Sequence, residues 1–289
     1  QNTVKTAEDF HAMDGVSVSM GHDLAVTEVF ADKWADYSLV ILICVVCGLF
    51  VAERKEGLWP MIYAAPGGRW KLVCKRIGIL FAAAWIGTVL IVGSKILLCG
   101  WVFHGLGEWN RVLQSIPMFQ NVPIPFTIAE FWLLYIAVKA LGAFWIGLVL
   151  WAVLSAISNL GLALTAAGLL MGLEFACTAI PSSSMFAVLR YVNVFSYVDF
   201  IPVFSRYLNI SVFGGLISGS DLVLAILPFL CLFLAGLNVL IVERKHPVSA
   251  SNRLLHWADG MVRKLDPKLP WCGEFGKLLI KRKGAILLI

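Results

Sequence analysis

Three ionisable side chains lie inside long apolar runs of the sequence: Lys95, Lys139 and Glu174. A charge at such a position is costly and usually serves a function. Lys95 stands eight residues before Phe103 and Glu174 seven before Pro181, which places each about 10–12 Å from the end of its helix. We therefore expect Lys95 and Glu174 to pair inside a helical bundle, with Lys139 deeper on a neighbouring helix. The alternative is that both lysines extend their ammonium groups toward the membrane surface.

The sequence lacks the patterns of common nucleotide, metal and hydrolase sites. The cluster Gly67-Gly68-Arg69-Trp70-Lys71 has neither the spacing nor the hydroxyl of a phosphate-binding loop. The five histidines form no His-x-x-x-His pair, and no Gly-x-Ser-x-Gly elbow occurs. Cys44 and Cys47 have redox spacing, but they lie in mid-span, where small packing residues explain them better. We expect no metal, no cofactor and no enzyme activity in this chain.

The composition is 60% apolar and 14% charged, which is typical of an integral membrane protein. A spanning helix needs about 20 apolar residues. The apolar runs predict an all-α transmembrane domain over residues 37–242 with five complete spans. These spans are residues 37–52, 77–103, 127–155, about 160–181 and 221–242, and residues 284–289 begin another.

Local signals predict how the spans begin and connect. An amphipathic helix from about Leu24, capped by Asp23, is expected to run straight into the first span. Thr127-x-x-Glu130 is a capping box that opens the third span. Residues 155–159 form a hinge before a glycine-rich span. Residues 182–220 are amphiphilic and are expected to form short helices at the outer interface.

Lysine and arginine counts predict the orientation. Segment 53–76 has six of these residues and segment 243–283 has ten, whereas segments 1–36, 104–125 and 182–220 have two, one and two. The two basic segments are expected to be cytosolic and residues 1–36 to be outside, in a multi-pass protein of the cytoplasmic membrane. This orientation requires a span before Gln1. The basic residues thus indicate sidedness, and we expect no nucleic-acid partner.

Small residues follow helical spacing along the glycine-rich span: Gly161, Thr165, Gly168 and Gly172, followed by Ala176 and Ala179. A strip of small side chains lets another helix approach closely. We interpret it as a packing face, which could contact a second half of a dimer.

Residues 53–76 combine basic and aromatic side chains between two apolar runs. This is typical of a segment at the membrane face with its apolar side among lipid headgroups. Pro60 and Pro66-Gly67-Gly68 are expected to break it into short helical pieces. A span ending in Glu53-Arg54-Lys55-Glu56-Gly57, then aromatic residues, Pro66, Arg69 and a basic run, resembles the permease subunits of type-2 ABC exporters. The resemblance covers about residues 37–245 and includes Asn209–Gly214 before the last span.

The resemblance implies a helical bundle of the six-span ABC exporter permease type, in which segment 53–76 is a coupling helix that docks into an ATPase subunit. ATP and Mg²⁺ would bind that partner. The docking residues would be Glu53, Arg54, Lys55, Glu56, Gly57, Trp59, Pro60, Tyr63, Pro66 and Arg69. A second permease half, fused or separate, and membrane lipid complete the expected partners. Because Glu274–Gly284 resembles the interfacial helix before a first span, residues 243–283 would be a basic cytoplasmic linker in a fused permease.

The leading hypothesis is therefore the transmembrane subunit of an exporter that moves an amphipathic or apolar cargo (a peptide, drug or lipid) and is driven by a partner ATPase. A second hypothesis is a membrane sensor or scaffold that signals without transport. An intramembrane enzyme is disfavoured, because the predicted spans contain no histidine. Nucleotide-stimulated transport in vesicles distinguishes the first hypothesis from the second.

Overall fold

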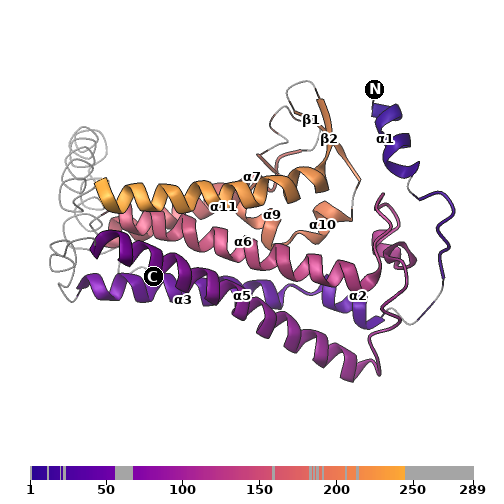
Figure 1. Cartoon of the computed structure of the whole chain (residues 1–289), viewed down its shortest axis with the longest axis horizontal. Helices are drawn as coiled ribbons and strands as arrows, with labels where there is room; N and C mark the ends of the chain where they lie inside the picture. Colours follow the sequence, from indigo (N-terminus) through magenta and orange to yellow (C-terminus); the bar gives the residue numbers. More distant parts are fainter. Residues whose placement is uncertain are drawn as a thin grey trace, which may run out of the picture. The chain divides into compact units, whose positions relative to one another are not determined.

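The structure, a computed structural model, consists mainly of helices, with a small two-stranded hairpin (Figure 1). The residues that it describes are 2–11, 13–19, 21, 24–55, 68–157, 160–181, 184, 186, 189–190, 192–205, 207–212 and 215–244.

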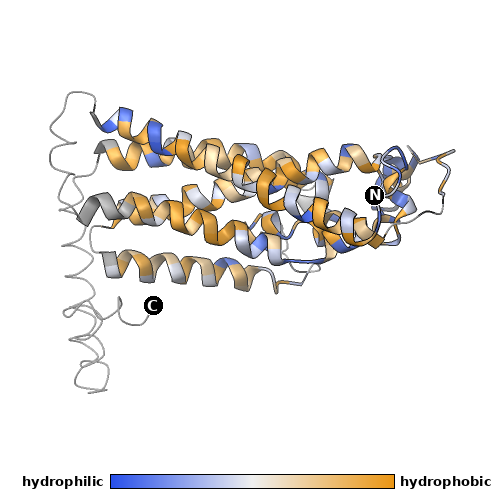
Figure 2. Ribbon diagram, turned by 90° about the horizontal axis from the view of Figure 1, so that it is seen from below, coloured by the Kyte–Doolittle hydropathy of each residue, from blue (hydrophilic) through white to orange (hydrophobic). Residues whose placement is uncertain are grey.

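Three helices are long and apolar enough to cross a membrane: α5 (Gly68–Val102), α6 (Ile128–Ala156) and α11 (Gly219–Arg244). Apolar residues cover most of their length (Figure 2). These helices confirm three of the five predicted spans by length and composition, and they support the membrane class. Helix α6 is the most enclosed, since 67% of its apolar window is buried, against 28% for α5 and 22% for α11.

The first predicted span, residues 37–52, lies within α3 (Trp34–Lys55), and the amphipathic helix expected before it is α2 (Leu24–Ala31). The two helices are bent by 42° at residues 32 and 33, and we call this bent pair the broken span. Neither helix alone is counted as a candidate span, but the pair together is long and apolar enough to cross a membrane. The expectation of a helix running straight into the span is therefore wrong, because polar residues end α2 before α3 begins.

The predicted glycine-rich span is shorter than expected. Helix α7 (Leu160–Cys177) has 18 residues, about 27 Å of helix, and it ends four residues before Pro181. With the bent pair included, the described part of the chain holds up to four candidate spans where the sequence predicted five. The hinge is close to its predicted place, because α6 ends at Ala156 and α7 starts at Leu160.

The chain divides into two compact units. Unit 1 contains residues 1–46, 79–146 and 174–231, and unit 2 contains residues 47–78, 147–173 and 232–289. Among the described residues, all those predicted to lie outside belong to unit 1. All those predicted to be cytosolic belong to unit 2.

Aromatic rings form the core of unit 1. Phe30 on α2 packs against Phe119, which ends the turn η2 (Pro117–Phe119), at a ring distance of 5.4 Å. It also stacks on Trp132 at 4.5 Å and contacts Phe131 and Tyr135 edge-on. Such pairs contribute about 0.5–1.5 kcal/mol beyond their buried area. The short helix α2 is thus held by its aromatic contacts with α6.

The predicted capping box of α6 is confirmed. The backbone amide of Thr127 donates to Glu130 Oε2 at 2.8 Å, and the amide of Glu130 donates to Thr127 Oγ1 at 3.2 Å. The reciprocal bonds satisfy amides that a helix start otherwise leaves without partners.

Residues 182–220 contain the predicted short helices and an unpredicted hairpin. The helices are α9 (Val194–Val198) and α10 (Ile201–Phe204). Strands β1 (Asn209–Val212) and β2 (Gly215–Ser218) pair in antiparallel fashion just before α11. In α9, the Asn193 side chain caps the start of the helix by accepting from Ser196 N at 2.8 Å.

Unit 2 holds its helices together by contacts to α6. Asn238 of α11 donates to the Leu148 carbonyl at 3.0 Å, and the Cys47 thiol of α3 donates to the Gly147 carbonyl at 3.6 Å. Cys44 and Cys47 form no disulfide with any described residue. The Arg76 guanidinium of α5 lies 5.2 Å from the centre of the Phe50 ring of α3, in a cation–π contact.

Candidate functional site

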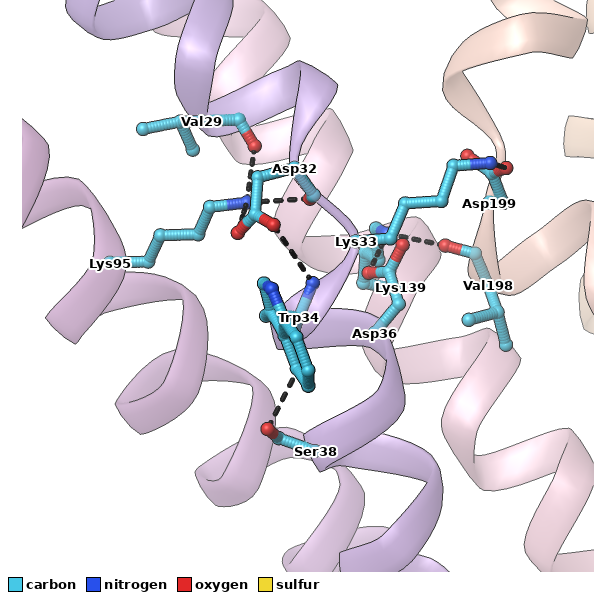
Figure 3. Close-up of polar contacts among 10 residues, drawn as sticks. All are labelled: Val29, Asp32, Lys33, Trp34, Asp36, Ser38, Lys95, Lys139, Val198 and Asp199. Carbon is cyan, nitrogen blue, oxygen red and sulfur yellow. Dashed lines mark hydrogen bonds and ion pairs between the residues drawn. The ribbon is translucent and has the colours of Figure 1, made fainter.

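Lys95 and Asp32 stabilise the break in the first span. Lys95 of α5 donates to the carbonyls of Val29 and Asp32, each at 2.7 Å, and pairs with Asp32 Oδ2 at 3.1 Å (Figure 3). Asp32 Oδ1 accepts from the amide of Trp34 at 3.2 Å, at the start of α3. A helix end leaves carbonyls without partners, and a cation placed there also complements the helix dipole. The lysine therefore ends α2 and the aspartate begins α3.

Lys139 is the most buried charge of the site. Its ammonium group pairs with Asp36 of α3 and donates to the Val198 carbonyl at the end of α9 (Figure 3). It also lies 5.0 Å from the centre of the Tyr135 ring. The side chains of Lys139 and Asp36 are only 2% and 7% exposed. Lys139 therefore does not extend toward the membrane surface, and it joins three helices.

A third ion pair is more exposed. Lys33, at the break, pairs with Asp199, which follows α9, at 2.5 Å (Figure 3). Their side chains are 53% and 33% exposed. Lys33, Lys95 and Lys139 thus each pair with a different aspartate within unit 1.

The predicted pair between Lys95 and Glu174 is wrong. Lys95 bonds to the end of α2, as described above, and Glu174 Oε2 accepts from the backbone amide of Val194 at 3.2 Å. Val194 is the first residue of α9, so the carboxylate lies at the positive end of that helix. Glu174 thus fixes α9 to the end of α7, a partner that spacing along the chain did not indicate.

A cavity of about 530 Å³ adjoins the polar cluster within unit 1. Its apolar wall comes from one face of α3, the end of α7, and the α9–α10 segment, and it includes Tyr37, Val40, Ile41, Phe175, Phe195 and Val203. Its polar edge includes Lys33, Asp36, Arg190, Ser196 and Asp199. Cavities of about 300–1,000 Å³ with apolar walls and a few polar groups are typical of small-molecule sites. This shape and chemistry suit an amphipathic molecule.

A second polar cluster attaches α1 (Asn2–His11) to the residues around β1. Asp9 accepts from Lys5 and from the Tyr207 hydroxyl at 2.6 Å, and Asn209 donates to Asn2 at 2.7 Å. Burial raises the pKa of Asp9, but the hydrogen bonds from Lys5 and Tyr207 outweigh it and hold the pKa below its usual value. The same bond raises the pKa of Lys5. The cluster favours the charged carboxylate and is remote in sequence from the break.

Four of the predicted docking residues lie at described helix ends. Glu53, Arg54 and Lys55 belong to the last turn of α3, and Arg69 to the first turn of α5. The other predicted docking residues lie outside the described residues: Glu56, Gly57, Trp59, Pro60, Tyr63 and Pro66. The linker 243–283 and residues 284–289 also lie outside them, except for the last two residues of α11.

The strip of small residues on α7 has no close neighbour over most of its described length. Gly161 is buried and its carbonyl accepts from Thr165 Oγ1 at 2.9 Å. At Gly168 and Gly172, no atom lies within 4 Å of the place where a Cβ would be. Packing against another copy stays a prediction.

Sequence reasoning missed the acidic half of the site. Asp32 and Asp36 appeared to belong to an acidic outer segment, and Asp199 and Arg190 to an interfacial one. A signal was present, because two lysines within apolar runs each need a partner. Asp32 and Asp36 are four residues apart at the point where the amphipathic helix meets the span.

Among the described residues, no group of three or more His, Cys, Asp or Glu side chains is arranged to hold a metal ion. Comparisons of the chain with protein families, with characterised proteins and with solved structures found no match.

Proposed function

We propose that this chain is the transmembrane subunit of an ATP-binding-cassette exporter that moves an amphipathic or apolar cargo across the cytoplasmic membrane. The observation that carries the proposal is the cavity of about 530 Å³ beside the broken span. Apolar side chains from four helices, α3, α7, α9 and α10, form one wall, and charged side chains form the edge, so one molecule can contact both the wall and the edge. A chain with long apolar helices and such a cavity is suited to handle amphiphiles.

The energy source is proposed to be a separate ATPase that binds residues 53–76 on the cytosolic side. The support is the resemblance of Glu53–Gly57 and the residues after it to a coupling helix, together with the lack of a phosphate-binding loop in the sequence. Helix α3 ends at Lys55 and α5 begins at Gly68. A protein that binds between them therefore acts on both helices at once.

Within unit 2, those two helices are linked by the contact between Arg76 and Phe50, and Phe50 lies 6.0 Å from the Trp151 ring of α6. A displacement of the coupling segment can thus reach α6 through packed side chains. Transport by this route needs two arrangements of the bundle whose populations the partner shifts when it binds ATP.

The test is ATP-dependent uptake of a fluorescent amphiphile into inside-out vesicles from native cells that lack or carry the gene. We expect uptake with ATP, none with a non-hydrolysable analogue, and none without the gene. Ile41→Trp, which fills the cavity, should abolish uptake. The control is Leu49→Trp, since Leu49 is on the same helix and 62% exposed, as Ile41 is at 63%, but does not line the cavity.

Trp59→Glu tests the docking role. Charge at this apolar position of the coupling segment should leave the protein inserted but separate ATP hydrolysis from uptake. Uptake that needs no nucleotide, or that is indifferent to Ile41→Trp, would refute the proposed function.

A further inference from the structure

Among the described residues, one cation that lines the cavity next to the broken span forms no ion pair. Lys33, Asp36, Arg190 and Asp199 line it, and Lys139 pairs with Asp36. Lys33 is neutralised by Asp199 at 2.5 Å. Of these five side chains, Arg190 is therefore the one without an ion-pair partner in the described part of the chain.

Most of the five N–H donors of the Arg190 guanidinium have no hydrogen-bond acceptor among the described residues. Within the part of the chain that the structure describes, its guanidinium makes one hydrogen bond, from Nη1 to the Ile180 carbonyl at 3.3 Å. Its backbone is fixed more firmly, because its carbonyl accepts from Ser196 Oγ at 2.5 Å and from Asn193 Nδ2 at 2.6 Å. The residue is therefore held beside α9 with most of its donors available to a ligand.

The opposite wall is apolar and accessible. Tyr37, Ile41 and Phe175 line the cavity and are 58%, 63% and 63% exposed. Tyr37 and Ile41 are four residues apart on α3, so they lie on one face of the helix. An alkyl chain along this face would cover surface that otherwise contacts lipid.

We infer that this cavity binds a single-chain amphiphile with an anionic head, with the head on Arg190 and the chain along Tyr37, Ile41 and Phe175. A guanidinium binds phosphate or carboxylate oxygens in a two-pronged manner and is weakly hydrated, which favours it for such heads. The volume of the cavity suits one chain rather than a two-chain lipid. That this amphiphile is the cargo rests on the proposed export, whereas the binding site itself does not.

The test measures binding to the full chain in phosphatidylcholine nanodiscs. Dodecylphosphonate, dodecyltrimethylammonium and dodecyl maltoside share one chain length, and each competes for a dansyl-labelled alkyl phosphonate. The anionic compound should displace the probe at a concentration at least about tenfold lower than either of the others, because it alone gains charge-assisted bonds.

Substitutions test whether Arg190 causes the preference for the anionic head group. Arg190→Gln should weaken phosphonate binding by at least about tenfold, and Arg190→Lys should keep the order of the three heads. Lys71→Gln removes an exposed cation of α5 that is not part of the cavity, and it should leave binding of the three compounds in nanodiscs, which contain no ATPase, unchanged. Ile41→Trp should abolish binding of all three compounds.

Equal affinity for the three heads would overturn the inference, and so would full phosphonate binding by a folded Arg190→Gln protein. If that variant does not fold, the comparison of the three head groups on the unaltered chain still tests the inference. Competition that weakens as protein concentration rises would mean that a second copy occupies the cavity, which also overturns it. Head-selective binding without ATP-driven uptake refutes the exporter and keeps the site. ATP-driven uptake that depends neither on the head group nor on Arg190 keeps the exporter and refutes the site.

Discussion

Replacing Lys139 by methionine should destabilise the protein strongly, and a second substitution should reverse most of the loss. Lys139 pairs with Asp36, and both side chains are nearly inaccessible. Lys139→Met leaves the carboxylate without its counter-charge, which costs about 3–5 kcal/mol when a buried pair is broken. Asp36→Leu should cost less than Lys139→Met, because the ammonium group keeps the Val198 carbonyl and the Tyr135 ring.

The double variant should be more stable than Lys139→Met alone. Two apolar residues in place of a buried pair are often neutral, so the remaining loss is the bond to the Val198 carbonyl, about 1–3 kcal/mol. The measurement is the free energy of unfolding in mixed micelles titrated with a denaturing detergent, followed by tryptophan fluorescence. Lys33→Met is the control, and it should cost about 1 kcal/mol or less because the Lys33–Asp199 pair is partly exposed.

Two results would refute this reasoning. The first is a double variant that is less stable than Lys139→Met, which would mean that the losses add and the two groups are independent. The second is a loss on Lys33→Met as large as that on Lys139→Met, which would mean that burial does not set the cost.

Three further predictions concern the elements around the site. Gly142→Leu should destabilise by about 1–3 kcal/mol, because its Cβ would lie 3.0–3.1 Å from the Cβ and carbonyl oxygen of Tyr197 in α9, whereas Gly236→Leu meets open space and should be tolerated. Lys95→Met should lower the hydrogen-exchange protection of α2, whose last carbonyls lose a charged donor. The folded pKa of Asp9 lies below the usual 3.8, so its stabilising effect is present above that value and is lost as the pH falls through the folded pKa. Exchange protection of α1 should therefore decrease on acidification below about pH 4, and less so in Asp9→Asn.

Features set by local chemistry could be predicted from the sequence. Long apolar runs gave the three spanning helices, since backbone groups in lipid must bond within the segment. The capping box at Thr127 and Glu130 depends on four consecutive residues and was predicted correctly. The hinge before α7 followed from polar residues between two apolar runs.

Features set by distant contacts could not be predicted. The break at Asp32 is stabilised by Lys95, more than sixty residues away, so the local polar residues Asp32 and Lys33 were not sufficient to predict it. Sequence spacing placed Lys95 and Glu174 at similar depth in the membrane. Similar depth does not mean that the two side chains face each other across the helical bundle. Arg190 gained a role only once Lys33 and Lys139 were known to be neutralised by Asp199 and Asp36.

The lysines of this site show why a charge within an apolar run can indicate a helix end elsewhere. Lipid offers no water to the carbonyls that a helix end leaves free, so a break within a span needs donors from another element. Lys95 supplies them to α2 and Lys139 supplies one to α9. Each lysine therefore satisfies a carbonyl that would otherwise lack a partner, and this hydrogen bond offsets part of the cost of burying the lysine. An aspartate next to each lysine balances its charge. An intramembrane lysine without an acidic neighbour in sequence is thus a reason to look for a broken helix in the element packed against it.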